Sequence, residues 1–89
     1  AEIDAQNDMG ETALLIATME GYNDLVKLLV ENGANVNLVD NSQNSPLFYA
    51  SEKGYTEIVE ILLLSFGPYF FTRLVFFLTV MWKIVANTL

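Results

Sequence analysis

Carboxylates are the most frequent side chains in this sequence that could do chemistry. Glu2, Asp4, Asp8 and Glu11 lie close together at the start of the chain, and paired carboxylates can act as general acid and base or bind a cation. The 89-residue chain has no Cys and no His. Thiol nucleophiles, imidazole catalysis and zinc sites built on those ligands are therefore excluded. The acidic cluster is most simply a solvated rim, and we expect no catalytic activity, no metal and no cofactor.

A second polar segment, Asp40-Asn41-Ser42-Gln43-Asn44, looks at first like a calcium-binding loop. Such a loop needs Gly at its sixth position and Glu at its twelfth. Ser45 and Ser51 stand at those positions, so we reject a calcium site. The sequence also lacks a Gly-rich phosphate loop and a nucleophile elbow.

Charge and hydrophobicity divide the chain into two parts. The sequence as a whole is 53% hydrophobic and 17% charged, a composition that excludes a disordered chain. Its net charge of −7 argues against sequence-independent binding to nucleic acid. Residues 1–60 hold all eleven acidic side chains and two basic ones, for a net charge of −9, whereas residues 61–89 carry two basic side chains and seven of the eleven aromatics. The two parts have to be interpreted separately.

The acidic part contains an internal repeat with a period of 33 residues. Hydrophobic, small and glycine positions agree together across the two copies, which chance rarely produces. The matching segments are Thr12–Ala17 with Ser45–Ala50, Gly21-Tyr22 with Gly54-Tyr55, Leu25–Val30 with Ile58–Leu63, and Ala1–Asp4 with Ala34–Asn37.

Each copy predicts two short helices joined by a tight turn. Thr12 and Ser45 are good N-cap residues, and Gly21 and Gly54 suit the left-handed backbone that ends a helix. Asn23 and Thr56 are expected to cap the second helices. The predicted helices are 13–20, 24–32, 46–53 and 57–65. Since one helix pair of this size cannot bury its own apolar face, the pairs are expected to stack.

These motifs resemble the ankyrin repeat. The family's T-P-L-H-x-A signature appears as Thr12–Ala17 and again as Ser45–Ala50, and its later I-V-x-L-L-x-x-G-A-x-V-N element appears as Leu25–Asn37. The resemblance implies an all-α solenoid of helix-turn-helix repeats. It divides the chain into the end of a preceding repeat at 1–6, repeats at 7–39 and 40–66, and a hydrophobic segment at 67–89.

Three positions depart from the family pattern. Leu15 and Phe48 replace the usual His, so the Thr–His hydrogen bond that tightens each family repeat is absent. Gln43 replaces the Gly of the family turn, whereas Gly10 retains it. If the backbone has a positive φ at position 43, Gln43 stores strain of about 1 kcal/mol or more.

The resemblance also implies a function. Ankyrin-like arrays are non-catalytic protein-binding modules, and we expect this one to be cytoplasmic and to form part of a longer array. The family grips its partners with the turn tips and the exposed side of each first helix. Carried over by position, these are Asp8, Met9, Glu11, Met19, Glu20, Val39, Asn41, Ser42, Asn44, Glu52 and Lys53. The acidic balance favours a partner protein with basic patches over a nucleic acid.

The hydrophobic segment 67–89 allows several interpretations. We expect a helix over 69–86, although its Phe and Val content suits a strand nearly as well. The helix could cap the open end of the second repeat, with Phe70, Leu74, Phe77 and Leu78 against Leu62 and Tyr55. Alternatively, it could insert in or lie on a membrane, with the repeats in the cytoplasm. A third alternative is a tail that does not belong to these repeats.

Overall fold

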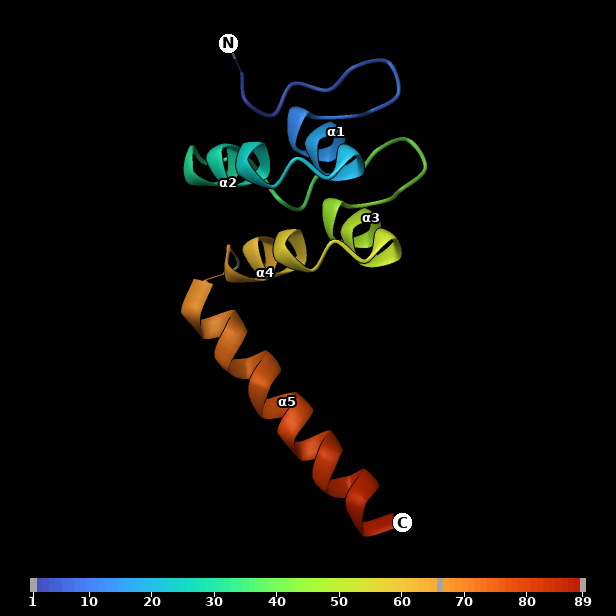
Figure 1. Ribbon diagram of the computed structural model, residues 1–89, viewed down its shortest axis with the longest axis vertical. Helices are drawn as coiled ribbons and strands as arrows, with labels where there is room; N and C mark the ends of the chain where they lie inside the picture. The colour runs from blue at the N-terminus through green and yellow to red at the C-terminus, as the bar shows by residue number, and fades with distance from the viewer. Residues whose placement is uncertain (1, 66, 89) are drawn as a thin grey trace.

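Helices follow one another without an intervening strand in the computed structural model, which describes residues 2–65 and 67–88, with side chains for 2–65 and 77–87. The helices are α1 Ala13–Glu20, α2 Asn23–Glu31, α3 Pro46–Lys53, α4 Thr56–Leu64 and α5 Gly67–Thr88. α1 and α2 form one antiparallel pair, α3 and α4 form the next, and the pairs stack with α1 beside α3 and α2 beside α4 (Figure 1). This is the all-α repeat solenoid that the sequence predicts.

The first helix of each repeat begins and ends as its local sequence indicates. The Thr12 and Ser45 hydroxyls accept hydrogen bonds from the backbone N–H of Leu15 and Phe48, which satisfies donors left free at a helix start. Gly21 and Gly54 follow the helices with φ of 75° and 73°. This left-handed conformation is costly for residues with a Cβ, so both glycines are needed to end the helices.

The second helix of each repeat begins one residue earlier than predicted. Tyr22 and Tyr55 occupy the N-cap positions and form no side-chain capping bond. The prediction that Asn23 and Thr56 cap these helices is therefore wrong. The turn between the two helices is too short to place the N-cap one residue later, because the backbone N–H of each Tyr already bonds to the preceding helix. The Asn23 side chain instead bonds to Glu57 of the next repeat, with 2.7 Å between Nδ2 and Oε2.

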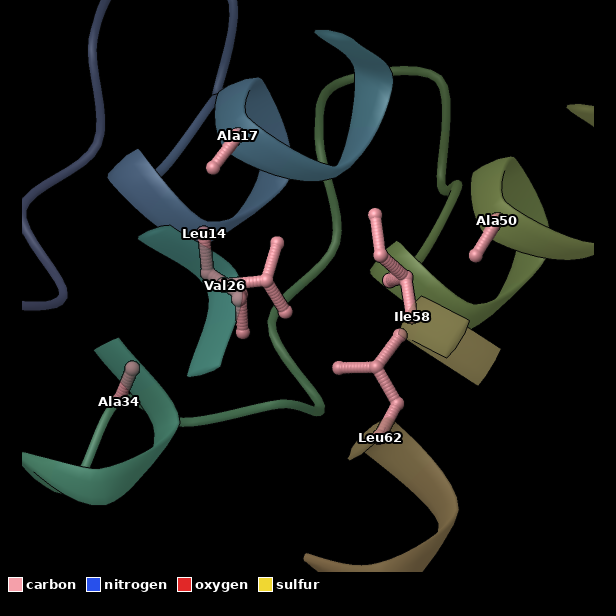
Figure 2. Packing of buried hydrophobic residues seen from close by; sticks show 7 residues of the cluster. All are labelled: Leu14, Ala17, Val26, Ala34, Ala50, Ile58 and Leu62. Atoms are coloured by element: carbon pink, nitrogen blue, oxygen red, sulfur yellow. The ribbon is translucent and has the colours of Figure 1, made fainter. Parts of the chain in front are cut away.

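The hydrophobic core runs continuously through both repeats. It is built from Leu14, Ala17, Val26, Ala34, Ala50, Ile58 and Leu62, which are all buried (Figure 2). Small residues occupy the positions on α1 and α3 where two helices approach each other. A single core across two helix pairs means that neither repeat completes its interior alone.

Equivalent residues of the two repeats differ in burial according to their place in the stack. Ile58 is 0% exposed because it lies under the first repeat, whereas its counterpart Leu25 is 40% exposed. On the opposite side, Leu15 is 0% exposed under the second repeat and its counterpart Phe48 is 45% exposed. The stack therefore has an open apolar face at each end of the repeats.

Helix α5 does not cap the second repeat. It starts beside the end of α4 and then runs away from both repeats (Figure 1). Phe77 is 60% exposed and Leu78 is 57% exposed, so the capping prediction is wrong for these residues. Ten residues of helix span about 15 Å, which carries both side chains beyond the reach of the repeats. Phe70 and Leu74 lie outside the described side chains.

Membrane-spanning capacity was a second expectation for this segment. None of the helices, over the part of the chain that the structure describes, is long and apolar enough to cross a bilayer.

Truncating a core leucine should destabilise the fold far more than truncating an exposed one. We expect Leu14→Ala to lower the free energy of unfolding by about 3 kcal/mol, because Leu14 is 1% exposed and its loss leaves a cavity. Leu28→Ala is the matched control on α2, where the side chain is 54% exposed. Its effect should stay below about 1 kcal/mol. Chemical denaturation measures both, and equal losses would contradict the assigned core.

Candidate interaction surface

The turn before α1 is closed from within by one side chain. Asn7 Oδ1 accepts hydrogen bonds from the backbone N–H of Met9 at 3.0 Å and of Glu11 at 2.9 Å. The Asn7 carbonyl also accepts from the N–H of Gly10 at 2.9 Å. These bonds satisfy the polar groups that face into the loop. Asp8 and Met9 are left exposed at the tip.

The turn before α3 repeats this arrangement 33 residues later around Asp40. Its Oδ1 accepts from the backbone N–H of Ser42 at 2.9 Å and of Asn44 at 3.0 Å, and its carbonyl accepts from Gln43 N–H at 2.9 Å. The Tyr49 hydroxyl of α3 donates a short hydrogen bond to Asp40 Oδ2 and accepts one from the Asn44 amide. The second turn is thus tied to its helix as well as to itself.

Hydrogen bonding shifts the pKa values of Asp40 and Tyr49 in opposite directions. The bond from Tyr49, together with those from the backbone N–H of Asn44 and Ser42, holds the pKa of Asp40 below its usual value, although partial burial acts the other way. The same bond raises the pKa of Tyr49, because the carboxylate stabilises the protonated hydroxyl. The charged carboxylate therefore stabilises the turn.

The two turn tips are joined to each other. The Asn41 backbone N–H donates to the Met9 carbonyl at 3.0 Å, and its side-chain amide donates to the Asp8 carbonyl at 2.9 Å. The Gln6 amide bridges the turns a second time through the carbonyls of Gly10 and Val39, at 2.8 and 3.1 Å. These bonds hold both tips as one surface on the side of α1 and α3, opposite α2 and α4 (Figure 1).

Gly10 is required by this contact as well as by its backbone. Its φ is +78°, and a Cβ at this position would lie 2.5 Å from Asn41 Oδ1 and 2.7 Å from Asn41 N. Gln43, the equivalent residue of the second turn, has a φ of 67°. The condition for strain at this non-glycine position is therefore met, and the Gln43 side chain is exposed.

The exposed sides of α1 and α3 continue the surface from the turn tips. Glu20, Glu52 and Lys53 are exposed near the ends of these helices, and Met19 is half-buried. Lys53 Nζ donates a hydrogen bond to the Met19 carbonyl at 3.0 Å, which joins the two helix ends. The surface therefore carries acidic side chains at both its edges.

The residues expected to bind a partner fall into two groups. Several take part in the bonds that hold the surface together or are half-buried within it: Glu11, Met19, Val39, Asn41, Asn44 and Lys53. The others are exposed, and where they take part in those bonds they do so through the backbone and not the side chain: Asp8, Met9, Glu20, Ser42 and Glu52. The second group is the better candidate for direct contact with a partner.

Ile16 is a surface residue that the sequence analysis missed. It is 42% exposed, and it lies one helical turn from Glu20 on the same side of α1. It lies inside the Thr12–Ala17 motif, which was assigned to the fold and not to the binding surface. The four-residue spacing from Glu20 was the signal that could have placed it on the exposed face.

Carboxylate clusters do not form a metal site in the described part of the chain. No three acidic, His or Cys side chains gather there within reach of one ion.

Adding a methyl group should cost more at Gly10 than at another left-handed glycine. Gly54 has a similar φ of +73° but open space around its Cβ position. Gly54→Ala should therefore lose only the backbone cost of about 1–2 kcal/mol. Gly10→Ala should lower the free energy of unfolding by more than this and weaken the hydrogen bonds between the two turns. Chemical denaturation measures the unfolding free energy of each variant, and hydrogen exchange of the Asn41 backbone amide reports on the bond between the turns. Equal losses of unfolding free energy, with the Asn41 amide still protected from exchange in Gly10→Ala, would contradict this prediction.

The Asp40 carboxylate should make stability depend on pH in the acidic range. Its folded pKa is lowered, so its contribution is present above the unfolded value of about 3.9 and is lost as pH falls through the folded pKa. Asp40→Asn copies the natural arrangement at Asn7 and keeps the backbone acceptor. We expect the stability difference between wild type and this variant to shrink below about pH 4. A constant difference in denaturation experiments from pH 7 to 3 would contradict this role.

Comparison with known proteins agrees with the arrangement of these turns and helices. Residues 1–70 match the family model described as ankyrin repeats (3 copies). A crystal structure of the ankyrin repeat protein EF0377 is 51% identical, covers 70% of this chain and 34% of that chain, and superposes with a TM-score of 0.68.

Curated relatives carry a similar segment within longer chains. The putative ankyrin repeat protein L92 of Acanthamoeba polyphaga mimivirus is 45% identical over 64 residues, which are 71% of this chain and 16% of the relative. The ankyrin repeat and KH domain-containing protein mask-1 of Caenorhabditis elegans is 38% identical over 65 residues, or 73% of this chain and 2% of the relative. The chain thus spans less than a fifth of these relatives. On its sequence motifs, fold and family match, it belongs to the ankyrin-repeat family.

Proposed function

We propose that this chain is a non-catalytic protein-binding module that holds its partner on the joined turn tips and the exposed side of α1 and α3. Ankyrin repeats are in general protein–protein interaction modules. The observation that carries the proposal for this chain is the pair of bonds from Asn41 to the carbonyls of Met9 and Asp8. They make a prearranged surface out of two loops.

Prearrangement favours binding because the loops lose little freedom when a partner docks. Asn7 and Asp40 hold the loops from within, and the side chains at the tips remain outside these networks. A surface of this kind can change its outward residues without changing its fold. The outward residues would then determine which partner is bound.

The chemistry of the outward residues indicates the class of partner. Met9 is 66% exposed and Ile16 is 42% exposed, and both offer apolar contact. Asp8, Glu20 and Glu52 add exposed carboxylates to the same turns and helices. We infer a protein partner in the cytoplasm with an apolar anchor flanked by Lys or Arg, whose approach the acidic charge accelerates.

Helix α5 favours a second candidate function. Its described side chains include several large exposed hydrophobics, which fits association with a bilayer through residues 69–86. Flotation of the intact chain with lipid vesicles tests this candidate. If the protein stays in the unbound fraction at every lipid concentration, the bilayer candidate is rejected.

Charge reversal on the turn-tip side should abolish partner binding. We expect Asp8→Lys with Glu20→Lys to lose the partners that wild type captures from lysate, because both exposed carboxylates then repel basic groups. Asp24→Lys with Glu60→Lys makes the same change in charge on α2 and α4, at exposed positions on the opposite side, and should keep them. Affinity capture with quantitative mass spectrometry compares the two variants. If only the variant that contains Asp24→Lys loses the partners, the binding surface lies on the side of α2 and α4, and the proposal is contradicted.

A further inference from the structure

Helix α5 exposes many large apolar side chains along its described length. Its described side chains include seven large hydrophobics that are between 38% and 70% exposed: Phe77, Leu78, Val80, Met81, Trp82, Ile84 and Val85. Soluble monomers rarely expose a contiguous apolar patch of more than a few hundred Å². Something is therefore expected to cover this helix.

The pattern on α5 suits packing against another helix. At about 100° per residue, the seven side chains occupy an arc of about 200° centred on Met81. Leu78, Met81 and Val85 follow the spacing of three and four residues that forms a helix–helix seam. Thr79, Lys83 and Asn87 fall together on the opposite arc. The helix thus has one face to bury and one narrow face for water.

A second apolar feature lies next to the start of α5. A groove of about 250 Å³ separates the ends of α2 and α4, and it is lined by Lys27, Val30, Glu31, Ile61, Leu64 and Ser65. Its lining is mostly apolar, with one basic and one acidic residue from α2. A helix that runs past the start of α5 would meet this groove.

The charges of the chain favour one orientation for a pair of α5 helices. Residues 1–60 carry a net charge of −9, and residues 61–89 contain no acidic side chain. A parallel pair would bring two acidic repeat regions together. An antiparallel pair places them at opposite ends of a helix about 33 Å long, several Debye lengths apart at physiological salt. It also brings Lys83 of each copy towards the acidic repeats of the other.

We propose that the protein forms an antiparallel homodimer in which α5 pairs with α5 of a second copy through the arc around Met81. The C-terminal turns of each α5 then lie against the groove between α2 and α4 of the other copy. A standard interface buries about 800 Å² per partner, and the helix arc and the groove together supply apolar surface for it. The turn tips lie outside this interface, so the dimer is independent of the proposed partner-binding function.

Sedimentation of the full chain over a wide concentration range at physiological salt tests the dimer. We expect wild type to dimerise and Met81→Asp to weaken the dimer at least about tenfold, because a carboxylate would then be buried in the seam. Thr79→Asp adds the same charge on the opposite arc, away from the C-terminal turn, and should leave the dimer intact. Circular dichroism checks that the repeats stay helical. A wild-type monomer at all concentrations, or a Met81→Asp dimer of unchanged strength, would overturn the proposal.

Cross-linking tests the orientation, since the chain has no natural Cys. Lys27→Cys in one copy and Asn87→Cys in another should form a mixed cross-link when the two proteins are combined. Efficient Asn87→Cys self-linking without the mixed product would overturn the antiparallel arrangement. Wild type that floats with phosphatidylcholine vesicles while remaining monomeric in solution would assign the apolar arc to lipid and reject the dimer.

Discussion

The contact between the two repeats is the constraint on which the rest of this structure depends. Neither helix pair can bury both of its sides, and Leu15 and Ile58 reach 0% exposure only where the pairs meet. The same contact sets the distance between the turns. Because the helices stack with a regular offset, Asn41 comes within hydrogen-bonding distance of Met9 and Asp8. The interaction surface is thus a consequence of core packing.

Equivalent positions of the two repeats have different surroundings, because the first repeat and the second repeat have their neighbour on opposite sides. Gly10 lies under Asn41 and has no room for a Cβ, whereas the chain carries an exposed Gln at the equivalent position 43. Leu15 is a core residue, and Phe48, its counterpart, presents much of its ring to solvent. The repeat pattern describes the fold of each unit. Burial depends on whether a neighbour lies on that side.

The two proposed surfaces use separate parts of the molecule. The turn tips and first helices are acidic and lie on one side of the stack, while α5 is apolar and extends from the end of α4 (Figure 1). A dimer formed through α5 would present two copies of the acidic surface. Binding to a partner with several basic sites would then gain from the raised effective concentration of the second surface.

The sequence by itself determined the elements, because their signals are local. Thr12 and Ser45 cap helices, Gly21 and Gly54 end them, and the 33-residue period requires that they stack. Only the tertiary structure decided which turn residues are free. Asn41 and Val39 bond to residues 33 positions away, and no local pattern distinguishes them from Ser42. The direction of α5 was likewise undetermined, since its many apolar residues suit a cap on the second repeat as well as a membrane-associated segment. Hydrophobicity favours burial but has no direction, so contacts distant in sequence had to decide where each side chain lies.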